Sequence, residues 1–364
     1  MWFLKARKYL KLTIEVNMEE NMSKIINLFA ILLLSLMVMF AVSCEGPAGT
    51  DGLAGADGTD GAAGADGADG MDGNVTCIGC HSEANMIDNQ IEMSRSQHGI
   101  GEWINYADYY GGGCARCHSG NGFIEFVTTG EVADNVKVPE AWDCGTCHGL
   151  HTTFEEADYA LRLTDASPAM FDATVSLDVD ENSNLCVSCH QARRGPAQYW
   201  DGVADSVSLA AAQHPGPHHG PQSNVLLGNL GASSTGAPFA AHVGAGCVGC
   251  HMTEGTGDDA NVAGGHTFKP LVEGCANTGC HTSATDFDLF GGQTSVTTKM
   301  EALNGHLLTA GILDSTGHLH DGTYSAEVFQ AWWNYVVVHE DRSLGVHNPT
   351  YTHALLDEAI DLVD

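Results

Sequence analysis

The sequence has few positive charges and few regular apolar patterns. The first shortage limits the partners that the protein can bind, and the second limits its secondary structure. Its 364 residues carry 14 Lys and Arg against 46 Asp and Glu, which gives a formal net charge of −32. Such a charge repels nucleic acid and favours cationic partners, metal ions or basic patches on other proteins, although acidic residues also serve solubility. Strongly periodic segments are scarce while Gly occurs 44 times. We therefore expect mostly irregular structure with short α-helices and little β-sheet.

One long apolar run stands out, from Ile25 to Val42, and Lys24 precedes it. A basic residue, an apolar stretch and small residues before a cleavage point are typical of an export signal. We therefore expect residues 1–43 to form a signal peptide, with the true start at Met18 or Met22. A retained helix is an alternative, because this run could just span a bilayer.

Cys44 follows this run and resembles the acylated cysteine of a bacterial lipoprotein. We expect lipidation at Cys44 and sorting to the outer membrane or cell surface, because Glu45 rather than Asp follows it; an unlipidated, cleaved signal peptide is the alternative. From Gly46 to Gly73 the chain follows Gly-x-y triplets with Asp in most third positions, so residues 44–73 comprise the acylated Cys and an acidic, collagen-like stalk. The triplets fit either a flexible acidic stalk or a collagen-like trimer, because only Gly fits the axis of a triple helix.

Twelve of the thirteen cysteines occur in pairs that are each followed by His. Five copies read C-x-x-C-H, and a sixth reads C-x-x-x-x-C-H. The pairs are Cys77 and Cys80, Cys114 and Cys117, Cys144 and Cys147, Cys186 and Cys189, Cys247 and Cys250, and Cys275 and Cys280. The histidines that end the motifs are His81, His118, His148, His190, His251 and His281.

C-x-x-C-H is the attachment sequence of a c-type haem. Its two thiols can form thioethers with the two vinyl groups of one porphyrin, and the adjacent His then lies under the iron as its proximal ligand. Zinc knuckles and disulfides also use paired cysteines, but neither needs a His after every pair. The sequence therefore predicts six covalently bound haem c groups, with a disulfide between Cys275 and Cys280 as the alternative at the stretched copy.

The number of histidines indicates how the irons are ligated. There are 19 His, and after six proximal ligands thirteen remain for six distal positions. That surplus permits two His ligands on every iron. A haem with both axial positions filled passes electrons and binds no substrate at iron, and His on both sides keeps its potential low.

Residues 75–364 resemble multihaem cytochromes c of metal-reducing and related bacteria. The stretches that carry the resemblance are SRSQHG, CGTCHGLH, PHHGPQSNVLLG, FAAHVGAGCVGCHM, GGHTF and DRSLGVHNPTYTHALL. The resemblance implies one domain, residues 74–364, wrapped around a chain of haems. It also implies the distal ligands His98, His151, His218, His242, His266 and His347, with His219, His306, His318, His320 and His339 in reserve. Which distal His serves which haem stays open.

Several further residues have a predicted place around the haems. His151 lies beside the haem of His148, so ligation of the next iron by His151 would bring two porphyrins into close contact. We expect Met252 to pack rather than to ligate, and Arg193 and Arg194 to pair with haem propionates. Two helices are predicted near the C-terminus. One spans Ser325–His339 and carries Trp332 and Trp333, which should pack on haem faces or in the core; the other begins at Asn348-Pro349 and runs through residues 354–362.

These features together predict an exported electron carrier that acts at the cell surface in extracellular electron transfer. Its expected partners are other cytochromes or redox proteins and extracellular metal oxides, together with the membrane through the lipid anchor, and self-association as a filament or collagen-like trimer is an option. A reductase of nitrite, hydroxylamine or a sulfur oxyanion is the alternative. The sequence also resembles multihaem nitrite reductases near its C-terminus. The catalytic haem of those enzymes is attached through C-x-x-C-K, and this motif does not occur here.

Overall fold

The computed structural model describes residues 81, 83–109, 112–153, 156–233, 236–256, 261–277 and 280–364. The chain divides into two units, Met1–Ala68 and Asp69–Asp364, and every described residue belongs to the second. The predicted signal peptide, the lipidation site Cys44 and the Gly-x-y triplets lie outside the described residues.

The first cysteine–histidine motif is described only at its last residue, His81. Both of its cysteines, Cys77 and Cys80, lie outside the described residues. The attachment of a haem through Cys77 and Cys80 therefore stays a prediction from the sequence. Of this motif, only the position of His81 can be used below.

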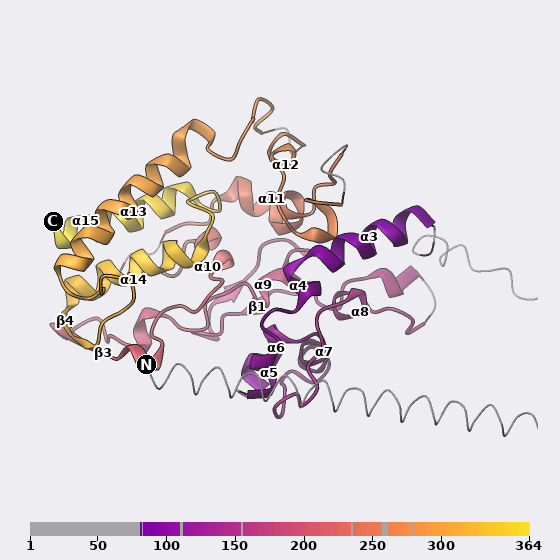
Figure 1. Ribbon diagram of the computed structural model, residues 1–364, viewed down its shortest axis with the longest axis horizontal. Coiled ribbons are helices and arrows are strands. Elements are labelled where there is room, and N and C mark those ends of the chain that lie inside the picture. The colour runs from indigo at the N-terminus through magenta and orange to yellow at the C-terminus, as the bar shows by residue number, and fades with distance from the viewer. Residues whose placement is uncertain are drawn as a thin grey trace, which may run out of the picture. The chain divides into compact units, whose positions relative to one another are not determined.

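Helices and short turns dominate the described part of the chain (Figure 1). The α-helices are α3 (Glu83–Arg95), α4 (Gln97–Ile100), α5 (Asn105–Tyr109), α6 (Gly112–His118), α7 (Gly120–Thr129), α8 (Cys144–Cys147), α9 (Asn184–Val187), α10 (Gln222–Leu227), α11 (Ala240–His251), α12 (Val272–Asn277), α13 (Gly292–Thr309), α14 (Ala326–Asp341) and α15 (Pro349–Val363). The 3-10 turns are η1 (Glu156–Tyr159), η2 (Pro196–Gln198), η3 (Ala211–Gln213), η5 (Gly265–Thr267) and η6 (Leu289–Gly291).

Sheet structure is limited to two antiparallel ribbons of two strands each within these residues. β1 (Ser167–Pro168) pairs with β2 (Ser176–Leu177), and β3 (Ser206–Leu209) pairs with β4 (Gly322–Ser325). The expectation of irregular structure with helices and little β is confirmed. Most helices before residue 290 have 13 residues or fewer, whereas α13, α14 and α15 have 18, 16 and 15.

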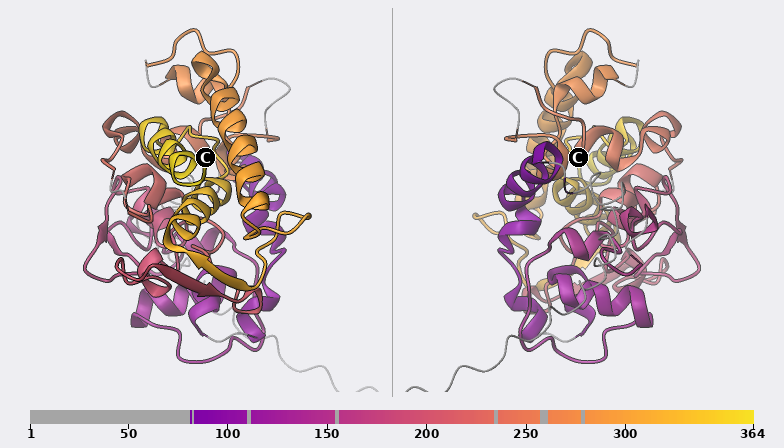
Figure 2. Two further views of the ribbon diagram at one scale, coloured as in Figure 1. Left: turned by 90° about the vertical axis from the view of Figure 1, so that its left-hand side faces the viewer. Right: turned by 90° about the vertical axis from the view of Figure 1, so that its right-hand side faces the viewer.

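The three long helices lie side by side and enclose the largest apolar core (Figures 1 and 2). Leu303 and Leu307 of α13, Trp333 of α14 and Leu355 of α15 are fully buried in it. Burying one such side chain contributes roughly 1.5–3 kcal/mol. Of the two predicted places for the tryptophans, the core is therefore the one they occupy. The Trp333 indole N–H also donates to the Leu230 carbonyl oxygen over 2.8 Å.

Both predicted C-terminal helices begin where their capping residues indicate. The Ser325 hydroxyl accepts the Val328 N–H at the start of α14, over 3.3 Å. The Asn348 side chain accepts the Tyr351 N–H at the start of α15, over 3.0 Å, and Pro349 occupies the first helical position. Each such cap stabilises its helix by about 1 kcal/mol.

The helices in the described ranges are all too short or too polar to cross a bilayer.

Candidate haem-binding site

Three of the helices end on a cysteine–histidine motif. α6 ends at His118 and α11 at His251, and α8 ends at Cys147 with His148 directly after it. In α8 the Asp143 carboxylate accepts the Thr146 N–H over 2.9 Å, while the Thr146 hydroxyl accepts the Asp143 N–H over 3.1 Å. This reciprocal cap fixes a helix of only four residues, so the two thiols of that motif are presented on one turn.

Four motif histidines each face a second histidine. The ring centres are 6.0 Å apart for His81 and His151, 6.0 Å for His98 and His190, 6.2 Å for His118 and His218, and 6.3 Å for His251 and His347. In every pair one member ends a C-x-x-C-H motif, and the other is a histidine that the resemblance implies as a distal ligand.

This spacing fits a metal ion between the two rings. An imidazole nitrogen binds a metal at about 2.0 Å, so two rings on opposite sides of one ion have centres roughly 6 Å apart. A pair of imidazoles supplies only two ligands. The four nitrogens of a porphyrin would complete an octahedral iron site, which is how two His ligands hold a c-type haem.

A charge interaction links a further motif histidine, His148, to the implied ligand His266. Burial lowers the pKa of His266, and the charge of His148 acts in the same direction while Glu92 opposes both. The Nδ1 atom of His266 is buried without a hydrogen-bond partner, and it lies 3.8 Å from a Glu92 carboxylate oxygen. The two imidazoles are thus close enough to interact, and one of them carries an unsatisfied polar atom.

The Nδ1 atoms of several motif histidines are already engaged by the protein. His148 Nδ1 lies 2.7 Å from the Tyr159 carbonyl oxygen, His251 Nδ1 lies 2.9 Å from that of Phe268, and His190 Nδ1 lies 3.1 Å from the Gln222 side-chain oxygen. Such contacts orient the ring and fix which nitrogen carries the proton. Nε2 is then the atom left to ligate iron.

His347 has the strongest of these supports. Its Nδ1 lies 2.6 Å from a carboxylate oxygen of Asp341, whose residue is only 2% exposed. Burial disfavours the charged form of His347, but the Asp341 carboxylate outweighs burial and the pKa of His347 is raised. A carboxylate on the far nitrogen makes an imidazole a more basic ligand.

His98 lies in an aromatic pocket. Trp142 and Phe268 approach its ring with centres 5.1 Å and 5.0 Å away. Burial, followed by the charge of His190, lowers the pKa of His98 to about 4. The imidazole is therefore neutral at neutral pH, which metal ligation requires.

Cysteines of different motifs touch one another. The Cys117 thiol interacts with that of Cys189, and the Cys186 thiol interacts with that of Cys247. Cys147 and Cys189 pack against one apolar cluster that contains Phe123. The fourth motif, which holds Cys186 and Cys189, thus contacts the second and fifth directly and shares a core with the third.

Gly246 lets the fifth motif reach the fourth. Its φ of +65° interrupts α11 immediately before Cys247. A Cβ there would lie 2.5 Å from the Ser183 hydroxyl, which accepts the Cys247 N–H over 2.8 Å. Only Gly combines this backbone angle with so close an approach.

His242 is the one implied distal ligand that faces no motif histidine. Its ring packs against Phe239, with centres 4.7 Å apart, and its Nδ1 lies 3.3 Å from the His347 carbonyl oxygen. Two of the reserve histidines are engaged elsewhere: His219 pairs with Glu340 over 2.7 Å, and the His339 ring stacks on Tyr335.

The two predicted propionate partners differ. Arg193 lies beside the pair His118 and His218, whose pKa values it lowers after the larger effect of burial. It is therefore placed to meet the edge of a haem bound there. Arg194 instead donates to the Tyr199 hydroxyl over 3.1 Å and to the His214 carbonyl oxygen over 2.9 Å.

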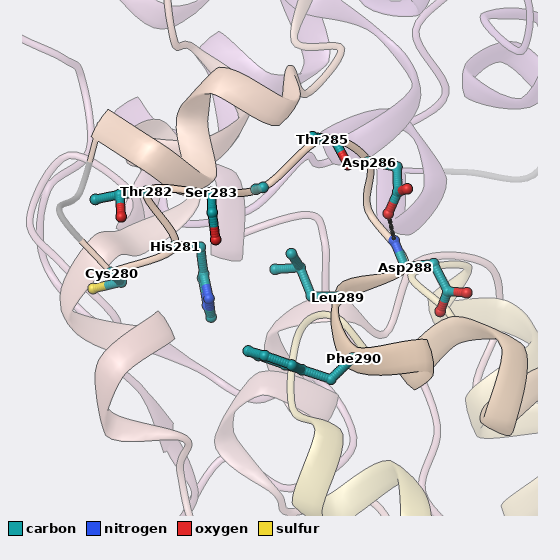
Figure 3. A pocket seen from close by; sticks show the side chains of 10 residues that line it. Cys280, His281, Thr282, Ser283, Thr285, Asp286, Asp288, Leu289 and Phe290 are labelled. Carbon is teal, nitrogen blue, oxygen red and sulfur yellow. Dashed lines mark hydrogen bonds between the residues drawn. The ribbon is translucent and has the colours of Figure 1, made fainter.

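The stretched sixth motif borders a cavity of about 370 Å³ (Figure 3). Cys275 lies in α12, and Cys280 and His281 follow it, while Leu289 and Phe290 of η6 line the opposite side. The ring that faces His281 is that of Phe290, with centres 6.3 Å apart.

Two residues of this site, Asp341 and Phe290, do not stand out in the sequence. Asp341 ends α14 and is the first residue of the stretch DRSLGVHNPTYTHALL, but the resemblance implies no role for it; its position six residues before an implied ligand is a usable signal. Phe290 lies nine residues after His281 in an irregular segment, and nothing in its sequence context marks it.

No protein-family model matches the chain, and no curated protein matches it significantly. Among solved structures the chain is similar to the outer cell wall cytochrome OcwA, at 18% identity and a TM-score of 0.49, over 75% of this chain and 50% of that one. It is also similar to an undecahaem cytochrome from the S-layer of Carboxydothermus ferrireducens, at 19% identity and a TM-score of 0.46, over 73% of this chain and 40% of that one. The chain spans half or less of these two structures.

Proposed function

We propose that the chain is an exported multihaem c-type cytochrome that transfers electrons along a chain of six covalently attached haems. The observation that carries the proposal is the set of facing histidine pairs. Four motif histidines lie 6.0–6.3 Å from a second histidine, which is the separation that one iron between two imidazoles requires.

Contacts between motifs support an order of transfer. His151 follows the third motif closely and faces His81 of the first, so those two haems would be neighbours. The third, second and fifth motifs all meet the fourth. Helices α11 and α12, which carry the fifth and sixth motifs, pack on each other. Electrons would therefore pass through haems one, three, four, five and six, with haem two joined to haem four.

Filled axial positions favour a carrier over an enzyme. An iron held by two imidazoles can accept and release an electron, but a substrate must displace a ligand that the fold holds in place. Buried His98 and carboxylate-supported His347 are ligands of that kind. The reductase alternative needs an iron with one open side, and the sixth motif is where a specific observation favours one.

The location and partners form part of the same proposal. Covalent haem attachment in bacteria takes place outside the cytoplasm, which agrees with the export signal at residues 1–43. Lipidation at Cys44 would anchor the domain at the outer membrane or cell surface, where other cytochromes or metal oxides could accept its electrons. The net charge of −32 favours cationic acceptors.

The test replaces one facing histidine by a weaker donor. In the holoprotein, His98→Met should raise the reduction potential of one haem, because Met stabilises ferrous iron more than His does. His320→Met is the control, since His320 is exposed and faces no motif histidine. The potentials are read from a spectroelectrochemical titration, and the haem count from the intact mass. An unchanged titration of the His98 variant would contradict the proposed ligation.

A further inference from the structure

The sixth motif departs from the other five. Four of the other motif histidines lie against a second histidine, and the charge of the fifth, His148, acts on His266, whereas His281 lies against Phe290. The separation of the ring centres is 6.3 Å, the same as for His251 and His347. A haem would therefore have equal space at both places. Phenylalanine has no lone pair and cannot ligate iron.

Phe290 is held in an unusual state. It is 97% exposed and has a φ of +57°, a conformation that a bulky side chain rarely adopts. Figure 3 shows its ring and that of His281 pointing toward each other across the cavity, with Leu289 beside them. A flat apolar group bound in this cavity would cover the Phe290 ring. The ring would then be exposed only while the cavity holds no such group.

No other histidine approaches His281. All nineteen lie in the described part of the chain, and the spare one that the resemblance implies, His242, contacts Phe239 and the His347 backbone. Asp286 and Asp288 line the same cavity. Hydrogen bonds from Thr294 lower the pKa of Asp288, so this carboxylate is ionised and disfavours anions nearby.

We propose that Phe290 covers the face of the sixth haem opposite His281, which leaves His281 as the only protein ligand of that iron; this rests on the haem attachment proposed above. Small uncharged ligands that bind ferrous iron, such as carbon monoxide, can enter when the exposed Phe290 ring turns aside. By the contacts between motifs, this haem ends the chain that begins at haem one.

The first experiment uses the full-length holoprotein. Low-temperature EPR of the oxidised form should show a high-spin signal from about one haem in six, and carbon monoxide added to the reduced form should shift about a sixth of the Soret absorbance. Six haems by intact mass with only low-spin signals and no carbon monoxide shift would overturn the inference and leave the electron carrier standing. A mass of five haems would overturn both the inference and the proposed count.

Variants at Phe290 connect the signal to this residue. Phe290→His should abolish the high-spin signal and the carbon monoxide shift, because it supplies the missing ligand. Val203→His is the matched control: Val203 is 82% exposed and lies outside the cavity, so both signals should persist. Phe290→Ala should keep both signals and bind carbon monoxide faster. A high-spin signal unaffected by Phe290→His would place the open haem elsewhere and refute the assignment.

A further variant tests the competing ligand. Under the proposal, His242→Ala leaves the number of high-spin haems unchanged. A new high-spin signal in that variant, from a wild type that shows none, would identify His242 as the distal ligand of the sixth haem and remove Phe290 from that role.

Discussion

At the scale of single residues, the protein controls its proposed ligands through what it places on their far nitrogens. His251 and His148 contact backbone carbonyl oxygens, and His190 contacts an amide oxygen. His347 alone among these has a buried carboxylate, Asp341, on Nδ1. The haem between His251 and His347 should consequently have the most electron-rich iron of the paired set.

Replacing that carboxylate by its neutral isostere gives a direct prediction. Asp341→Asn should raise the reduction potential of one haem, because the carboxylate stabilises ferric over ferrous iron through the imidazole. A tenfold weaker preference corresponds to about 60 mV for one electron. Potentiometric titration measures the shift, and Asp361→Asn, on the same group of helices but away from any motif, provides the control. A lowered or unchanged potential in Asp341→Asn contradicts this role.

Sequence alone went far toward naming these residues but not toward pairing them. The attachment residues repeat in a local sequence pattern, so they can be identified without knowing the fold. Cys77 and Cys80 are identified by this pattern alone, because the structure describes neither of them. The resemblance implies His98, His151, His218 and His347 as distal ligands, and each lies against a motif histidine. It also implies His266, which interacts with His148 through charge. Their pairing depends on contacts between residues far apart in the chain, which no local pattern encodes. The resemblance implies His242 as one of six distal ligands because each haem needs a distal ligand. The contacts of His242 give no support for that role.

At the scale of elements, capping residues predicted the C-terminal helices well, but their packing was not predictable. Helices α13, α14 and α15 bury a core of protein side chains such as Leu303 and Trp333. The apolar residues of these three helices are visible in the sequence. That the apolar faces pack against one another is shown only by the tertiary structure.

Tyr351 links this core to the irregular part of the chain, which makes it a sensitive position. Its hydroxyl accepts the N–H of Leu230 over 2.9 Å and also that of Gly231, and it is 2% exposed. Tyr351→Phe should lower the free energy of unfolding by about 1–3 kcal/mol, because two amides lose their acceptor. Tyr324→Phe removes an exposed hydroxyl that donates to the His320 carbonyl oxygen, and it should change stability by about 0.5 kcal/mol or less. Denaturant unfolding of both variants decides the point.

At the scale of the whole molecule, the helical core and the haem-bearing segments should differ in how much they need the cofactor. The haem-free chain should retain the apolar core of α13, α14 and α15, whereas the described residues before 190 form smaller clusters, such as that of Met93, Phe123, Trp142 and Leu185. Limited proteolysis of haem-free protein should therefore leave a fragment that contains residues 292–364. Protection of the segment 83–190 instead would contradict this division.

The fourth motif is the point where the proposed routes meet. Removing its haem with Cys186→Ala and Cys189→Ala should disconnect haems one and three from five and six. Removing haem two with Cys114→Ala and Cys117→Ala should leave that route intact. Transfer from a photoreduced donor to a terminal acceptor, measured in variants with five haems by mass, should slow strongly in the first and little in the second. Equal slowing would refute the central place of the fourth haem.

The five histidine pairs also determine how the polypeptide can be divided. Rings are in contact for His81 and His151, His98 and His190, His118 and His218, and His251 and His347, while His148 and His266 interact through charge. With each of these five pairs holding one iron as proposed, the loops that they close overlap in series from residue 81 to residue 347. A chain broken anywhere in that interval loses at least one partner. During export from the N-terminus, the distal histidines of the first three haems and of the fifth would be exported after the motifs that they serve. Only the fourth motif would be exported after its distal histidine, His98. Residues 81–347 are thus interlocked rather than modular, and truncation or domain shuffling within them would cost at least one of the proposed iron sites.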